Sequence, residues 1–442
     1  MRLKTLLIAG AVALSSQVNA QGWVDDSVTM GAGYANDVFY SLKNGAHPAV
    51  ANSNWHLAFQ MIPPGPGNVS ILANHVQAGV KVYSLHMRAA TNFTSLTPAD
   101  TIGKTGAGFE LFNADSNWNY GAFNRMNNPS DQFDYSWGLY NMSTHNVVGD
   151  SLYLVTVANL TGPQAYKVWV KQYVSNPADS VQWQVRIADF DGNNDTTIRI
   201  YRKPGFTDRL FAYFNLNTKT ITDREPSRSA WDVLFTRYKE YIPGAPGVPY
   251  YSVMGVLSNV NVTVYEKKLA TDDDTIGYAG YAYDDKLNEI GSDWKTFINP
   301  GPWTFADSTY YFVKTPNTNE YWQLHFTNFG GAADGKVVFK KRFLGSFTTN
   351  VAGINTPINT YKLVPNPANN DVSILIDTKD AVKNARLIVT DLTGRVVFNN
   401  VVSVNNGLNA FTVNTSNVAS GTYMVTVTNG AWKATEKLIV QH

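Results

Sequence analysis

The stretch Val181-Gln182-Trp183-Gln184-Val185-Arg186-Ile187 alternates large apolar residues with polar ones. Successive side chains of a β-strand point to opposite faces of a sheet, so this alternation predicts a strand with one buried and one solvated face. The same period recurs at Val260-Asn261-Val262-Thr263-Val264, and no stretch shows the 3.6-residue period of an amphipathic helix. The sequence therefore predicts an all-β protein built from antiparallel sheets.

The composition fits this fold class and excludes several functions. Aromatic residues make up 13% of the 442 residues and charged residues 16%, and the chain contains 33 Gly and 19 Pro, as expected for strands joined by many turns. The absence of cysteine excludes disulfides, thiolate metal sites and a cysteine nucleophile. The net charge is +1 and the basic residues form no runs, so we expect no nucleic-acid partner.

The first 20 residues are typical of a secretory signal peptide. Arg2 and Lys4 precede the apolar stretch Leu6 to Leu14, and Val18-Asn19-Ala20 provides a small-residue cleavage site. No later segment is long and apolar enough to predict a transmembrane helix. We therefore expect an exported protein that begins at Gln21.

The remaining chain divides at a polar stretch, residues 348–358, which contains Gly353 and Pro357 and is predicted to be a linker. Before it, the frame Trp-x-x-x-Phe occurs twice, at Trp55 and Phe59 and again at Trp231 and Phe235. Each frame follows an aromatic strand that ends in Leu42 or Leu216. We interpret this as one β unit used twice, with the four aromatic residues at equivalent core positions. The predicted units are a partial repeat over residues 21–125, a β domain over 126–347 and a C-terminal domain over 359–442.

The C-terminal domain carries several motifs in a fixed order: Leu363-Val364-Pro365-Asn366-Pro367-Ala368, then Asp391-Leu392-Thr393-Gly394, Gly421-Thr422-Tyr423 and Glu436-Lys437-Leu438. Their alternation and turn residues predict a small Ig-like β-sandwich. With these motifs the domain resembles the type IX secretion sorting domain of Bacteroidota. The resemblance implies passage across the outer membrane by the type IX machinery, followed by attachment to the cell surface or release. An Ig-like binding module that stays in the mature protein is the alternative.

The main body resembles the HmuY-type haem-binding family. The matching stretches include Trp137-Gly138-Leu139-Tyr140, Gly149 to Val155, Trp231 to Tyr238, and Leu324-His325-Phe326-Thr327. This resemblance implies an all-β body that takes up haem, with haem or host haemoproteins as partners.

Family members hold the haem iron between His or Met side chains, and these are the available ligands in a chain without cysteine. Candidates are His145 and Met142, in a polar turn, and Met254. A turn histidine that is simply solvated is the alternative for His145.

Two weaker patterns involve carboxylates. Asp189, Asp191 and Asp195 have the oxygen spacing of a calcium loop but lack the glycine and the late glutamate of an EF-hand, so a hairpin turn is the alternative. Residues 272–274 and Asp284 with Asp285 could supply the carboxylate pair of a glycosidase. No other catalytic motif is present. We therefore expect a binding protein rather than an enzyme, with an adhesin or glycan-binding module, and then a hydrolase, as alternatives to haem capture.

Overall fold

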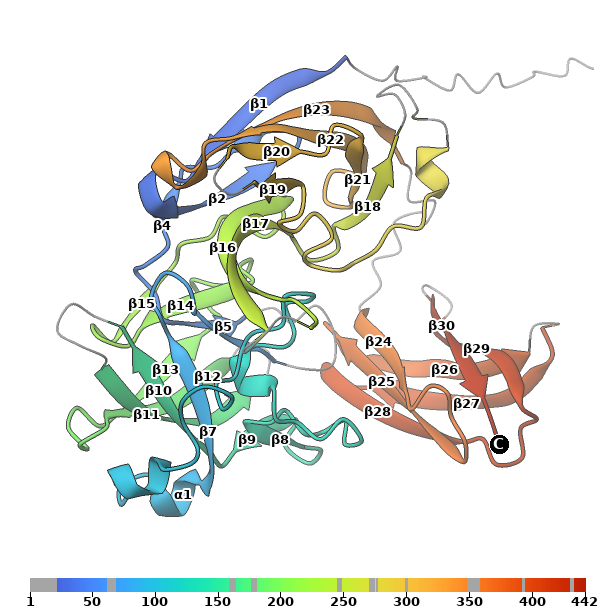
Figure 1. Cartoon of the computed structure of the whole chain (residues 1–442). Coiled ribbons are helices and arrows are strands. Elements are labelled where there is room, and N and C mark those ends of the chain that lie inside the picture. The colour runs from blue at the N-terminus through green and yellow to red at the C-terminus, as the bar shows by residue number, and fades with distance from the viewer. Residues whose placement is uncertain are drawn as a thin grey trace, which may run out of the picture.

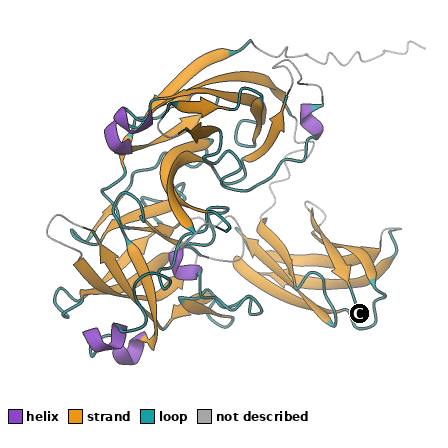
Figure 2. Cartoon of the chain, viewed as in Figure 1, coloured by secondary structure: helices purple, strands orange, loops and turns teal. Residues whose placement is uncertain are grey.

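Strands dominate the computed structural model, and the helices are short (Figure 2). The structure describes residues 22–61, 69–158, 164–175, 181–244, 249–269, 275, 277–298, 301–347, 358–391, 394–429 and 433–442. The prediction of an all-β fold is confirmed. The predicted signal peptide and nearly all of the predicted linker lie outside the described residues. Within those residues, no helix has the length and apolar character needed to cross a membrane.

The first lobe packs two antiparallel sheets face to face (Figure 1). One sheet has the order β13 (Thr196–Tyr201), β12 (Gln182–Asp189), β11 (Gln164–Val174), β10 (Ser151–Val157) and β7 (Lys81–Arg88), and β11 also pairs with the hairpin of β8 (Gly138–Asn141) and β9 (Asn146–Gly149). The other has the order β15 (Thr220–Thr222), β14 (Phe211–Asn215), β5 (Leu57–Gln60) and β6 (Ile71–Ala73). The apolar residues of the alternating stretch, Trp183, Val185 and Ile187, lie in the core between these sheets.

The second lobe has the same plan. One of its sheets has the order β1 (Val24–Thr29), β23 (Lys336–Ser346), β22 (Glu320–Phe329), β21 (Thr309–Thr315) and β18 (Thr263–Lys268). The facing sheet has the order β17 (Tyr250–Ser258), β16 (Val233–Tyr241), β2 (Asn36–Ser41) and β3 (Gly45–Ala46), with β4 (Val50–Ala51) also on β2. A short hairpin, β19 (Lys295–Phe297) and β20 (Trp303–Phe305), packs beside β22, while α1 (Ala89–Asn92) belongs to the first lobe.

The two lobes have the same plan, but their strands come from both sequence copies. The aromatic strand of each copy pairs with the strand that follows the Trp of the other copy. β2 pairs with β16 and β14 pairs with β5, so Phe235 lies opposite Val38 and Phe59 lies opposite Ala212. The N-terminal strands β1 and β2 therefore complete the second lobe, whereas β13 and β14 complete the first. Strands on both sides of the predicted boundary at residue 125 share sheets, because β7 also pairs with β10.

Matching hydrogen bonds establish this equivalence residue by residue. The residue after each Trp caps the partner strand: Nδ1 of His56 accepts from the Leu216 amide at 2.8 Å, and a carboxylate oxygen of Asp232 accepts from the Leu42 amide at the same distance. The asparagine directly after β6 or β17 donates to the carbonyl of the Trp in its copy. Asn74 donates to Trp55 at 3.0 Å, and Asn259 donates to Trp231 at 2.7 Å. These matched contacts give the two lobes the same local structure around each Trp.

The C-terminal domain is a third body with its own core (Figure 1). Its sheets have the orders β24 (Ile358–Val364), β25 (Asp371–Thr378), β28 (Gly407–Asn414), and β27 (Val396–Val404), β26 (Val382–Asp391), β29 (Gly421–Thr428), β30 (Lys433–Val440). The alternating residues Tyr423, Val425 and Val427 are buried between the sheets, as the sequence pattern predicts.

Candidate functional site

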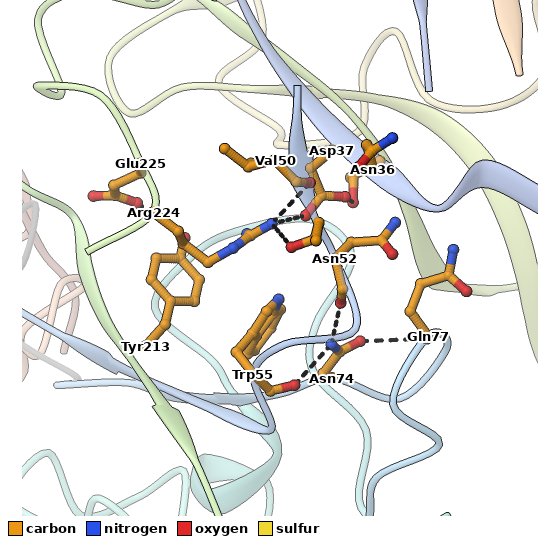
Figure 3. A network of polar contacts seen from close by, with 12 residues as sticks. Asn36, Asp37, Val50, Asn52, Trp55, Asn74, Gln77, Tyr213, Arg224 and Glu225 are labelled. Atoms are coloured by element: carbon orange, nitrogen blue, oxygen red, sulfur yellow. Dashed lines mark hydrogen bonds and ion pairs between the residues drawn. The ribbon is translucent and has the colours of Figure 1, made fainter. Parts of the chain in front are cut away.

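A cavity of about 90 Å³ lies where the sheet of β14 and β5 in the first lobe meets the sheet of β16 and β2 in the second lobe. The first lobe contributes Trp55 and Tyr213, and the second contributes Asp37, Thr236 and Arg237. Arg224 enters from the segment that follows β15. We call this space the interlobe cavity, and Figure 3 shows part of its wall. The site depends on the pairing of β2 with β16, because that pairing brings Asp37 and Thr236 to this wall.

Asp37 and Arg224 form a buried ion pair in the wall of the interlobe cavity (Figure 3). One Nη of Arg224 lies 2.8 Å from Oδ2 of Asp37, and the two side chains are 3% and 5% exposed. The same nitrogen donates to the carbonyl of Ala51 at 2.9 Å, and the Thr236 hydroxyl donates to Oδ1 of Asp37 at 2.6 Å. Removing one partner of such a pair leaves a buried charge, so Asp37 and Arg224 are required together.

Two aromatic rings flank the guanidinium group. Trp55 and Tyr213 contact edge to face, with ring centroids 5.1 Å apart, and the Arg224 guanidinium lies 5.0 Å from the Tyr213 centroid. The equivalent pair in the second lobe, Phe39 and Trp231, has nearly the same geometry at 5.0 Å. The two lobes thus share the aromatic pair, but the first lobe has Tyr213 where the second has Phe39.

Three nitrogen donors on the cavity lining have no hydrogen-bond partner among the described residues. They are Nε1 of Trp55, Nε of Arg224 and Nε of Arg237. A buried donor without an acceptor costs about 1–3 kcal/mol. Less than 1 Å² of each of these nitrogens is exposed, so the three donors are buried within the wall and do not open onto the cavity.

Several other polar groups of the lining are hydrogen-bonded within the protein. His75 uses Nδ1 toward the Val80 carbonyl at 2.8 Å, and its Nε2 accepts from the Asn113 amide at 3.3 Å. Burial lowers the pKa of His75 to about 4, so the ring is neutral at physiological pH. Asp115 accepts from the Tyr241 amide at 2.8 Å. These contacts hold His75 and Asp115 in place in the cavity wall.

A buried carboxylate lies behind Tyr213. Glu225 accepts hydrogen bonds from the Tyr213 hydroxyl and the Phe211 amide, both at 3.0 Å. Burial raises the pKa of Glu225 to about 7, although these hydrogen bonds favour the charged form. The unfolded value is about 4.3, so the folded protein binds more protons between pH 4.3 and 7. The stability that Glu225 contributes is therefore complete below this range and is lost as the pH rises through 7.

We expect Glu225→Gln to remove this pH dependence. Relative to the unchanged protein, the variant should gain about 2–3 kcal/mol in free energy of unfolding between pH 5 and pH 8. Denaturant titrations at both pH values measure the difference. Burial lowers the pKa of His56 and His75 to about 4, which acts in the opposite sense, but both histidines are present in both proteins. Parallel stability curves for the two proteins would contradict the prediction.

Motif residues near the start of the C-terminal domain form hydrogen bonds with its last strand, β30. The side chain of Asn366 donates to the Lys437 carbonyl at 2.6 Å and accepts from the Ile439 amide at 2.8 Å. Pro365 and Pro367 flank this asparagine. Tyr423 is buried and its hydroxyl donates to the Ala419 carbonyl at 2.7 Å. Gly394 has a φ of 87°, which favours glycine, and Gly421 begins β29. The motifs thus fix the fold of this domain.

Residues 362–441 match the family model described as the secretion system C-terminal sorting domain. The C-terminal domain is a type IX sorting domain. The match begins within three residues of the predicted boundary at 359. The sorting domain marks the chain as cargo of the type IX secretion system of Bacteroidota, destined for secretion or attachment to the cell surface, and implies contact with the type IX machinery.

The other comparisons say little about the main body. No curated protein matches the sequence. Among solved structures, the chain is similar to dimeric latent PorU from Porphyromonas gingivalis at 9% identity, with a TM-score of 0.17. That alignment covers 94% of this chain and 34% of the PorU chain, so the chain spans about a third of that protein.

The structure separates the three predicted haem ligands. Met254 is 5% exposed and lies in the core of the second lobe. Met142 is 56% exposed, and His145 lies on the same turn between β8 and β9. Nδ1 of His145 lies 2.8 Å from the Tyr140 hydroxyl. His145 and Met142 thus stay close to the surface, far in sequence from Met254.

The three predicted calcium ligands have other partners. Asp195 forms two hydrogen bonds with Arg186, at 2.9 and 2.6 Å. Asp191 accepts from Asn193, and Asp189 accepts from Asn194. These contacts are typical of a hairpin turn, and no group of three potential metal ligands occurs among the described residues.

Of the predicted glycosidase carboxylates, Asp284 pairs with Lys286 at 2.8 Å. Residues 272–274 lie outside the described residues, so the pairing of the two groups stays a prediction.

The four aromatic residues predicted for the core differ in their surroundings. Phe59, Phe235 and Trp231 are fully buried, but Trp55 is partly buried and lines the interlobe cavity. Sequence reasoning missed the site residues Asp37, Tyr213 and Arg224. The one local signal for them is Tyr213, which stands where the other repeat has Phe39. The other contacts of the site depend on strand pairing.

Proposed function

We propose that this protein is a secreted or cell-surface binding protein that holds one saccharide-type ligand in the interlobe cavity. The observation that carries this proposal is the lining of the interlobe cavity, which combines the polar side chains of Arg224 and Arg237 with the aromatic pair of Trp55 and Tyr213. Sugar rings offer oxygen acceptors at their edges and C–H groups at their faces, which suit polar donors and aromatic faces respectively.

The size of the cavity restricts the ligand. Pockets for drug-sized molecules measure about 300–1,000 Å³. At about 90 Å³, the interlobe cavity suits one ring or the end of a longer chain and is too small for a porphyrin. The proposal is for binding without catalysis. A glycosidase needs two available carboxylates, but Asp37 is engaged with Arg224 and Asp115 with the Tyr241 amide.

A binding titration of the full chain with a panel of monosaccharides tests the proposal. We expect one-to-one binding of at least one sugar, and we expect Trp55→Ala to weaken it at least tenfold because the variant loses an aromatic ring of the cavity wall. Trp169→Ala is the matched control, since this partly buried tryptophan lies on β11 outside the cavity. Equal binding by the Trp55 and Trp169 variants, or no binding to the unchanged protein, would refute the proposal.

Haem capture is the second candidate, and one surface feature supports it. A depression of about 430 Å³ is lined by His86, Met87 and Met126, which are side chains of the types that bind haem iron. Its size falls within the range for cofactor sites. His86 has a φ of 51° and lies within β7, where the pairing of β7 with β10 is irregular. Together with the HmuY-type resemblance, this favours the depression over the turn that carries His145.

An absorbance titration with haem distinguishes the two positions. If the depression binds haem, the protein should show a stoichiometric Soret shift that His86→Ala abolishes and His145→Ala leaves unchanged. Loss of the shift in the His145 variant alone would place haem at the turn instead. A chain that gives no shift at all would exclude haem capture.

A further inference from the structure

We infer that a component of the type IX machinery docks on the sorting domain by adding a β-strand to the free edge of β27. The family match implies contact with this machinery but does not say which surface of the domain makes it. The inference is independent of the proposed function, because it concerns the delivery of the chain and not its ligand.

Motif side chains of the sorting domain serve its own fold. Asn366 forms hydrogen bonds with two backbone groups of β30, and Tyr423 is buried with its hydroxyl donating to the Ala419 carbonyl. Side chains that make their hydrogen bonds within the domain have little left to offer a partner. The surface that the machinery contacts therefore lies among the exposed groups.

The exposed apolar side chains of this domain lie on one strand. Among its described residues, the exposed large apolar side chains are Val396 and Val401, which are 53% and 55% exposed. Both belong to β27. A single exposed valine is ordinary on a protein surface, but two on an outer strand place apolar surface beside unpaired backbone groups.

The backbone of β27 has a free edge. This strand is the outer strand of its sheet and pairs with β26 alone among the described residues. Its register with β26 is continuous from Phe398 to Val402, between two irregularities. Proteins often protect such an edge with charged side chains or proline, but residues 396–404 contain neither. The stretch is therefore a template to which a further strand can pair.

The other outer strands of the domain are less suited to this role. β30 carries Lys433, Glu436 and Lys437, and the entry of the domain already pairs with its end through Ala368. β24 carries Lys362. β28 is uncharged like β27, but its large apolar side chains are partly or fully buried. Only β27 combines a free edge, the absence of charge and exposed apolar side chains among the described strands of this domain.

Strand addition fits what a sorting signal has to do. Main-chain hydrogen bonds would supply the affinity, and a pocket for alternate side chains of the strand would accept Val401. The partner segment is then an extended, uncharged and largely apolar strand of a type IX component, because a charged segment would gain nothing from this edge.

Export of the full chain from a bacterium with a type IX system tests the inference. We expect the double variant Val396→Lys, Val401→Lys to lower the amount at the cell surface and in the medium about tenfold, since two ammonium groups on an outer strand oppose pairing. Ala410→Lys with Thr412→Lys is the matched control, because it adds the same charge at exposed positions of β28. Asn399→Ala keeps the backbone and both valines and should be exported normally. Circular dichroism of the purified variants measures folding.

A photo-crosslinking experiment tests the contact without added charge. With benzoylphenylalanine in place of Val401 in the otherwise unchanged chain, we expect a crosslink to a type IX component in the cell envelope. The same group in place of Ala410 should give none. This measurement decides the matter if the charged variant of β27 does not fold.

Several results would overturn the inference. Normal export of the folded β27 double variant, or an equal loss of export in the β28 double variant, would show that this edge is not the contact surface. A crosslink from the β28 position alone, crosslinks only between copies of this chain, or no crosslink from the β27 position would have the same meaning.

Discussion

Removal of residues 365–442 is expected to abolish accumulation of the protein at the cell surface and in the medium. The sorting domain carries the signal for the type IX machinery, so the truncated chain should stop in the periplasm. The main body should remain folded, because the sorting domain has a separate core from those of the two lobes. Cell fractionation with immunoblotting, together with circular dichroism of the purified truncated chain, measures both effects.

A point variant makes this prediction sharper. Asn366→Ala removes both side-chain hydrogen bonds that hold the domain entry to β30, so we expect a clear reduction in export. Asn399→Ala is the matched control, since Asn399 is exposed on β27. Surface accumulation of the truncated chain at the full-length level would show that this domain is dispensable for delivery.

Trp231→Ala is expected to destabilise the main body by about 3–5 kcal/mol, the usual cost of deleting a large buried aromatic side chain. Trp231 is 1% exposed and packs edge to face on Phe39 in the cluster where the two lobes meet. Its loss should therefore weaken the contact between the repeats as well as leave a cavity. Denaturant unfolding followed by circular dichroism measures the change in free energy.

The equivalent tryptophan provides the control for this measurement. Trp55 occupies the same place in the other repeat but is partly buried beside an existing cavity, so Trp55→Ala creates less new empty space. We expect its effect on stability to be clearly smaller, while its effect on ligand binding is larger. Equal destabilisation by the two variants would show that Trp55 is a core residue like its counterpart.

The fold class and the export of this protein can be predicted from the sequence alone. The period-two alternation around Trp183 predicts half-buried strands because a pleated strand points successive side chains to opposite faces. The motifs around Asn366 and Tyr423 lie within a contiguous segment of about eighty residues, so they identify the sorting domain without knowledge of distant contacts. The Trp-x-x-x-Phe frames at Trp55 and Trp231 likewise indicate the repeat.

The pairing of the strands and the position of the candidate site are visible in the tertiary structure alone. Both copies of the repeat carry the same alternation, so the sequence pattern does not distinguish pairing of β2 with β5 from its observed pairing with β16. That choice brings Asp37 to Arg224 across 187 residues of chain and leaves Trp55 on a cavity wall while Trp231 is buried. Alternation records which face of a strand is buried, whereas the partner of each strand depends on packing between segments far apart in the chain.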